Sequence, residues 1–192
     1  MRPNWFFAFP IDGSFVPALP APPPTFRLFP SEDVHLTLSF LGACGEASAR
    51  RALEALDATL AQRPAQSVEV SLGAVVPTGP KREYSALSAL LERGRDETAT
   101  LIAELRDVLS DAALGRRDKR PPKPHVTIAR PGRRATEAAR AAGLQWASGL
   151  DLRAIVARLD RIALYTWAEG SRRERLFRIE AERLIAGGVS PH

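Results

Sequence analysis

A four-residue pattern occurs twice in this chain and constrains its fold more than any other feature. It reads H-L-T-L at residues 35–38 and H-V-T-I at residues 125–128. In a β-strand, alternate side chains project to opposite faces, so each His shares one face with its Thr while the two aliphatic residues share the other. We therefore predict two strands, each anchored in a core on one face and carrying a His-Thr pair on the other.

Chance is a poor explanation for the repetition. The chain has only three His, and two of them followed by Thr at the second position would occur roughly once in a hundred sequences of this composition. The simpler alternative is a pair of half-buried structural histidines, because Thr is common in strands. The basic residues before the second copy favour a functional interpretation instead.

The length of 192 residues suits one globular domain with a sizeable core. We expect this domain to span residues 1–187, followed by a tail at 188–192. The apolar run at residues 5–9 is too short to cross a membrane, and Pro10 and Asp12 end it before a signal-peptide cleavage site could follow. We expect a cytoplasmic protein without membrane association, and we treat the single cysteine, Cys44, as a small apolar residue because no nucleophile signature surrounds it.

Positive charge points to partners that carry phosphates. The formal net charge is +5 and the sequence pI is about 10.1. Residues 116–124, R-R-D-K-R-P-P-K-P, form a basic, proline-stiffened loop that leads directly into His125. This loop is either a solvated connection or a surface that holds an anionic polymer beside the second motif.

Hydrophobic periodicity and turn residues predict an alternation of strands, helices and hairpins. Prolines make residues 13–30 a loop or an extended surface crossing. Residues 144–149 are ambiguous, and residues 175–184 fit a strand or a helix. The remaining predictions are strands at 5–9, 34–41, 68–76, 84–91, 125–130 and within 152–167, and helices at 46–62, 97–113 and 135–142. This order predicts an α+β architecture in which each half carries one motif.

Two imidazoles can act as acid and base in the same reaction. Near neutral pH one can accept a proton from an attacking hydroxyl while the other donates to the departing oxygen. In-line displacement at phosphorus needs these groups on opposite sides, and Thr hydroxyls suit the non-bridging oxygens. A strained cyclic phosphate or a phosphodiester with a neighbouring hydroxyl is the best substrate for such chemistry without a metal. A zinc site is the main alternative, although the chain offers only the two motif His, His192 and Cys44 as soft ligands. A Ser or Cys nucleophile lacks a supporting sequence.

The motifs with their tails, S-F-L-G after the first and A-R after the second, resemble those of the two-histidine (2H) phosphoesterase superfamily. They are most similar to the bacterial and archaeal RNA 2′,3′-cyclic phosphodiesterases, also called 2′-5′ RNA ligases. The resemblance covers most of the chain. Its further parts are the opening W-F-F-A-F, the hairpin ending near Leu91, and a closing L-Y strand.

This resemblance implies a bilobal α+β fold, with two pseudo-symmetric antiparallel sheets flanked by helices and an active-site groove between them. It implies metal-independent hydrolysis of a 2′,3′-cyclic phosphate RNA end to a 2′-phosphate, with no cofactor required. His35 would be the proton donor and His125 the acceptor. Thr37, Thr127 and Arg130 would bind the phosphate. Strict alternation from His125 puts Arg130 on the wrong face, so this role requires the strand to end or bulge before it.

Other interpretations stay open. The reverse reaction, 2′-5′ RNA ligation, uses the same acid and base, and a non-enzymatic RNA-binding module would use the basic loop alone. We expect a monomer whose partners are RNA ends carrying a 2′,3′-cyclic phosphate, with no obligate protein partner. The proline-rich residues 16–30 stand where relatives commonly carry a helix, which leaves the rim of the groove undefined.

Overall fold

The computed structural model describes residues 2–80, 83–169 and 175–185, so the predicted boundary between domain and tail at residues 187 and 188 lies outside the described residues. The described chain contains three α-helices: α1 (Glu46–Gln62), α2 (Arg95–Ala112) and α3 (Glu137–Ser148). Its strands are β1 (Trp5–Pro10), β2 (Phe26–Leu28), β3 (His35–Gly42), β4 (Val68–Thr78), β5 (Ala86–Arg93), β6 (His125–Pro131), β7 (Val156–Leu159), β8 (Arg161–Trp167) and β9 (Phe177–Leu184). Two short 3₁₀ helices, η1 (Val16–Ala18) and η2 (Ser31–Asp33), precede β3.

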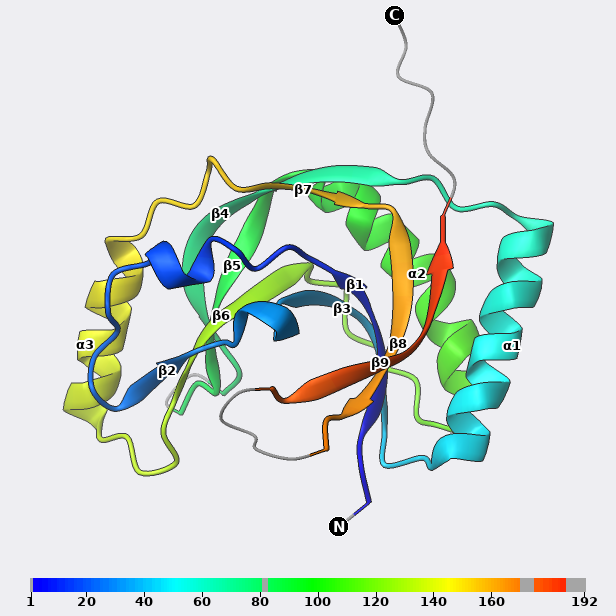
Figure 1. Cartoon of the computed structure of the whole chain (residues 1–192), viewed down its shortest axis with the longest axis horizontal. Coiled ribbons are helices and arrows are strands. Elements are labelled where there is room, and N and C mark those ends of the chain that lie inside the picture. The colour runs from blue at the N-terminus through cyan, green and yellow to red at the C-terminus, as the bar shows by residue number, and fades with distance from the viewer. Residues whose placement is uncertain (1, 81–82, 170–174, 186–192) are drawn as a thin grey trace, which may run out of the picture.

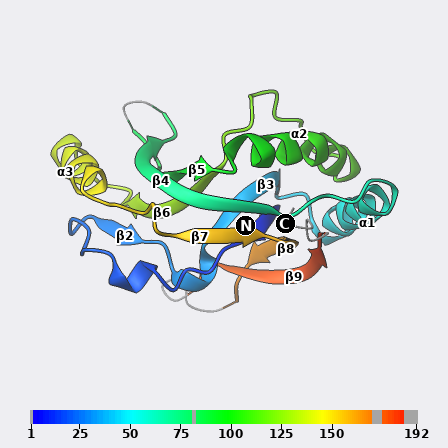
Figure 2. The same ribbon diagram turned by 90° about the horizontal axis from the view of Figure 1, so that it is seen from above.

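All strands join one curled antiparallel sheet in the order β7-β4-β5-β6-β3-β1-β8-β9, with β2 added to β6 (Figures 1 and 2). The two motif strands, β3 and β6, lie next to each other in the middle of this order and are joined through one residue pair, Leu36 with Val126. The predicted α+β fold with two antiparallel halves is therefore confirmed. The halves are continuous, and the motifs form their junction.

The helices pack at the two ends of the molecule. Figure 1 shows α3 at one end and α1 with α2 at the other. Helix α3 packs against β4 and β5, while α1 packs on α2, which in turn contacts β3. In the described parts of the chain, no helix combines the length and apolar character needed to cross a membrane.

The aliphatic residues of both motifs lie in the main core. Leu36, Val126 and Ile128 are fully buried, and Leu38 is nearly so. Each such side chain contributes roughly 1.5–3 kcal/mol through burial. The opposite face of the sheet carries a smaller apolar cluster, formed by Phe6, Ala8, Ala163 and Tyr165 with Phe177 and Ile179 packed against it. The His-Thr faces of the motifs share this second face.

Most predicted elements appear near their expected bounds. The helix at 46–62 is confirmed, and the hairpin of residues 68–76 and 84–91 corresponds to β4 and β5. The ambiguous residues 144–149 largely continue α3, which ends at Ser148. Residues 177–184 form a strand, because Phe177, Ile179 and Ala181 alternate with charged residues at the strand period of two.

The proline-rich segment is more structured than the predicted loop. Its proline-free residues Phe26–Leu28 pair with β6 as β2, and Phe26 is buried against α3, where a Cβ on Gly143 would clash with the Phe26 ring. The Trp146 indole donates to the Pro20 carbonyl over 3.1 Å, which ties the segment to α3. Proline excludes ladder hydrogen bonds at its own positions, but it leaves a short stretch between prolines free to pair.

Candidate active site

The motif side chains meet where β3 and β6 join. Leu36 is paired with Val126, and antiparallel register carried one residue to either side places His35 alongside Thr127 and Thr37 alongside His125. All four side chains are half-buried, whereas their aliphatic neighbours are buried. The fold thus brings two sequence-distant His-Thr pairs onto one face at one junction.

Each imidazole is held by a backbone carbonyl two residues before it. His35 Nδ1 lies 2.5 Å from the Asp33 carbonyl oxygen, and His125 Nδ1 lies 2.7 Å from the Lys123 carbonyl oxygen. A carbonyl can only accept, so Nδ1 carries the hydrogen in both rings. In a neutral ring this leaves Nε2 with its lone pair, so each His presents one nitrogen for proton transfer.

The surroundings of His35 are aromatic. Its ring centroid lies 5.0 Å from that of Phe6, 5.5 Å from Tyr165, 5.6 Å from Phe177 and 5.8 Å from Phe29. Burial among these rings, with the nearby Arg130 and His125, lowers the pKa of His35 to about 4. His35 is therefore neutral at pH 7 in the empty protein.

Arg130 reaches this face through a β-bulge. In the β5-β6 ladder, Leu87 pairs with Ala129 and Ser88 with Thr127, so two residues of β6 advance against one of β5. The bulge shifts the alternation and turns Arg130 to the side of the motif His. The strand therefore bulges before Arg130, as the role predicted for Arg130 from the sequence requires. The Arg130 guanidinium lies 5.2 Å from the centroid of the Phe29 ring, a cation–π contact.

A pocket of about 430 Å³ contains three of the five predicted site residues, His35, Thr37 and Arg130. His125 and Thr127 do not line it. The other lining residues are mostly apolar: Asn4, Phe6, Phe40, Trp167, Leu176 and Phe177.

The family model of the 2′-5′ RNA ligase superfamily matches residues 23–171, a range that includes both motifs and Arg130. The chain belongs to this superfamily. No curated protein sequence gives a significant match.

Several solved structures have the same fold. Escherichia coli LigT, solved with 3′-AMP, has a TM-score of 0.68 at 15% identity, covering 96% of this chain and 99% of that one. TT0787 of Thermus thermophilus has a TM-score of 0.68 at 19% identity, with 96% and 98% covered. Usb1 of Kluyveromyces marxianus reaches 0.51 at 12% identity, with 84% and 92% covered. At these identities the likeness shows the fold.

In this superfamily member the threonine hydroxyls are available to a ligand. Neither the Thr37 hydroxyl nor the Thr127 hydroxyl has a hydrogen-bond partner among the described residues. Over the same residues, no three His, Cys, Asp or Glu side chains gather in a group that could hold a metal ion. Burial raises the pKa of the Cys44 thiol, which keeps it in its less nucleophilic form.

Sequence reasoning missed Asp33. Its carboxylate is buried and accepts from the Leu176 amide over 2.6 Å and from the Phe177 amide over 3.1 Å, while its own carbonyl accepts from His35. Asp33 thus fixes both the His35 ring and the start of β9, which carries Phe177 against that ring. The only sequence signal was an acidic residue two positions before a motif His.

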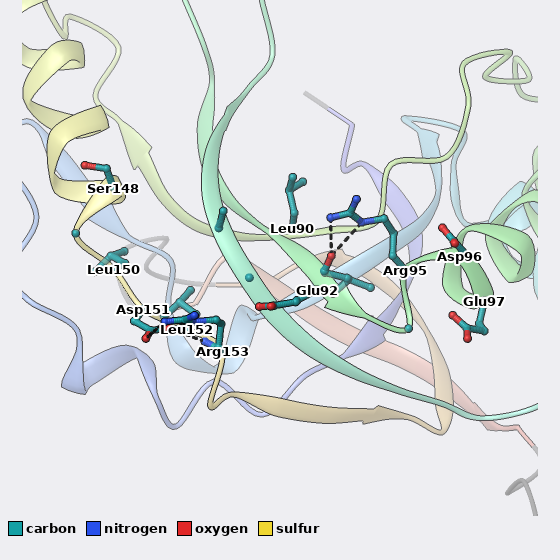
Figure 3. Close-up of a pocket in the computed structure, with 15 residues that line it drawn as sticks. Leu90, Glu92, Arg95, Asp96, Glu97, Ser148, Leu150, Asp151, Leu152 and Arg153 are labelled. Atoms are coloured by element: carbon teal, nitrogen blue, oxygen red, sulfur yellow. Dashed lines mark hydrogen bonds and ion pairs between the residues drawn. The ribbon is translucent and has the colours of Figure 1, made fainter.

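A larger pocket of about 790 Å³ lies away from the motifs, between the start of α2 and the end of α3. Figure 3 shows Asp151 and Arg153 on one side of it and Arg95 on the other. The Arg95 guanidinium donates to the Leu91 carbonyl, and Arg153 is paired with Asp151 over 2.8 Å. Its cations are already engaged within the protein, and it contains none of the predicted site residues.

The basic loop before His125 is partly neutralised. Arg117 is paired with Asp111 and with Asp107, and Arg120 is paired with Asp118 over 2.6 Å. These ion pairs reduce the charge that the loop can offer to an anionic polymer. RNA binding by this loop stays a prediction.

Proposed function

We propose that this superfamily member is a metal-independent RNA 2′,3′-cyclic phosphodiesterase. The observation that carries the proposal is the junction of β3 and β6. There two imidazoles, each with Nδ1 tied to a carbonyl, lie on one face with two unpartnered threonine hydroxyls and Arg130. These are an acid, a base and phosphate ligands for in-line displacement.

In the proposed reaction a water attacks the phosphorus of a 2′,3′-cyclic phosphate. His125 takes the proton of the water as the P–O bond forms, and His35 donates a proton to the 3′ oxygen as its bond to phosphorus breaks. The products are a 2′-phosphate and a 3′-hydroxyl. Thr37, Thr127 and Arg130 bind the non-bridging oxygens, where negative charge accumulates.

The donor role of His35 requires a proton on Nε2, although burial and Arg130 keep the ring neutral in the empty protein. A bound phosphate brings negative charge beside the imidazole and offsets the Arg130 cation. Opposite charge within a few ångströms raises the pKa of an imidazole. Substrate binding therefore favours the protonated form of His35, which is the form that can donate a proton from Nε2. The partner in this proposal is an RNA end, bound by a monomeric protein.

The first test is an assay on a small 2′,3′-cyclic nucleotide with chelator present. We expect hydrolysis that leaves the phosphate on the 2′ oxygen, and a loss of about a hundredfold or more in His35→Ala and in His125→Ala. Arg51→Ala, on α1 at the far end of the molecule, is the control and should keep the wild-type rate. Retained activity in both His variants would contradict the assignment, and a requirement for metal would contradict its metal independence.

The matched family is named for ligation, so the reverse reaction is the second candidate. It uses a 5′-hydroxyl in place of water with the same acid and base. Incubating RNA with a 2′,3′-cyclic phosphate end and RNA with a 5′-hydroxyl end, then looking for a 2′-5′ linked product, measures it directly. A binding module without activity would instead bind RNA in a salt-sensitive way after loss of both histidines.

A further inference from the structure

We propose that Arg27, Arg133 and Arg134 continue outward from Arg130 as a track for the RNA phosphates that precede the cyclic end. We call these four residues the β2-β6 arginine cluster. The inference rests on the proposed function, and it assigns the substrate class as an oligonucleotide rather than a mononucleotide.

The register of β2 on β6 places Arg27 directly opposite Arg130. Directly opposed residues of antiparallel strands project to the same face, and like charges in such a pair are destabilising. The neighbours of Arg27 agree with this orientation, because Phe26 is buried on the other side of the strand while Arg27 is exposed. Two guanidinium groups thus lie side by side on the face that carries His35.

None of the four arginines has a carboxylate partner among the described residues. Many other arginines are paired with carboxylates, for example Arg50 with Glu46 over 2.6 Å and Arg178 with Glu169 over 2.6 Å. The basic loop at residues 116–124 is also partly neutralised by its own ion pairs. A row of guanidinium groups without carboxylate partners can bind a run of phosphates, because each phosphate would neutralise a positive charge and accept hydrogen bonds from it.

The cluster continues outward from the catalytic pocket. Arg130 lines that pocket with His35 and Thr37. Arg133 and Arg134 follow in the exposed turn after β6, where the Gly132 amide donates to the Thr25 carbonyl over 2.7 Å, just before β2. Figure 1 shows β2 beside β6 at the end of the molecule that carries α3. The positive charge therefore extends from the proposed position of the reacting phosphate along β2 and the end of β6.

The direction fixes which phosphates would be bound. A 2′,3′-cyclic phosphate closes the 3′ end of an RNA, so the chain can continue only through the 5′-phosphate of the terminal nucleotide. Guanidinium binds a phosphate through two parallel hydrogen bonds. We assign Arg27 to that 5′-phosphate, beside Arg130 on the cyclic phosphate, and Arg133 and Arg134 to the phosphates upstream.

The test compares a cyclic mononucleotide that has no 5′-phosphate with a trinucleotide that ends in the same cyclic phosphate. In Arg27→Ala we expect KM for the trinucleotide to rise about five- to tenfold with kcat unchanged, and kinetics on the mononucleotide to stay within about twofold. Arg27→Lys should fall between wild type and Arg27→Ala. Arg51→Ala removes the same charge from α1 and should behave as wild type. Equal effects of Arg27→Ala on both substrates, or none on either, would overturn the inference and leave the proposed function standing.

A binding measurement separates the two proposals. Fluorescence anisotropy with a labelled trinucleotide ending in a 2′-phosphate needs no turnover, so it tests the track even if neither cyclic substrate is hydrolysed. Loss of one phosphate contact should reduce the slope of log affinity against log salt by about 0.7 in Arg27→Ala. An unchanged slope and affinity would also overturn the inference. Melting temperatures of the variants check that the edge strand β2 remains folded.

Discussion

The two motif histidines make the same backbone hydrogen bond but lie in different surroundings. Each donates from Nδ1 to the carbonyl two residues before it. His35 contacts four aromatic rings within 5.8 Å, whereas His125 has no aromatic ring contact among the described residues. Similar local sequence therefore yields one imidazole surrounded by aromatic rings and one without such contacts among the described residues.

At the residue scale, Arg130 contributes to the low pKa of His35. Burial is the larger cause of the lowered His35 pKa of about 4, and the Arg130 cation adds to it. In Arg130→Gln we expect the His35 pKa to rise above the wild-type value while burial keeps it below 6.5. An NMR titration of the ring protons measures this, and the chain has only three His to assign. Arg51→Gln is the control. An unchanged or lower His35 pKa in Arg130→Gln would contradict the contact.

At the scale of elements, the Asp33 side chain ties the start of β9 to the site. Asp33 is the last residue of η2. Its carboxylate accepts hydrogen bonds from the backbone amides of Leu176 and Phe177, where β9 begins. Burial raises the pKa of this carboxyl, and the two amide donors act against that rise. The position of Phe177 against His35 thus depends on a residue outside both strands.

We expect Asp33→Ala to lower the free energy of unfolding by about 2–3 kcal/mol, because two amides would lose their charged acceptor in a buried place. Asp33→Asn keeps the shape and one acceptor and should cost less. Urea denaturation measures both. Asp151→Ala, which breaks an exposed ion pair with Arg153, is the matched control and should change stability by no more than about 0.5 kcal/mol. A similar small change in Asp33→Ala would show that the Asp33 contacts are dispensable.

At the scale of the whole molecule, the candidate active site lies at a junction. The two halves of the sheet meet through Leu36 and Val126, and helices pack at both ends of the molecule. The site therefore needs the whole fold, because neither half presents both histidines.

The stability of the whole molecule should depend on pH through His35. Its folded pKa of about 4 lies below the ordinary 6.5, so between these values the unfolded chain binds a proton that the folded protein does not. Stability should fall as pH is lowered from 6.5 towards 4, by up to about 3 kcal/mol. His35→Gln lacks this contribution. As the pH is lowered over this range, the unfolding free energy of wild type should therefore fall relative to that of His35→Gln. A constant difference between the two proteins would contradict the prediction.

Local pattern was enough for most elements and for the candidate residues. The strand period of two placed His35 and Thr37 on one face and Leu36 on the other, and helical spacing gave α1 its bounds. The same alternation raised the question of how Arg130 could reach the site. The bulge at Ala129 that answers it depends on pairing with β5, which no local pattern encodes.

By itself the sequence determined which strands carry His-Thr faces, and it predicted the chemistry that suits those faces, because side-chain alternation and imidazole basicity are properties of a few adjacent residues. The tertiary structure alone decided what surrounds them. The aromatic box of His35, the hold of Asp33 on β9 and the pairing of Arg27 with Arg130 all join segments distant in the chain. Such contacts follow from strand order and register, which are set by packing the whole core at once.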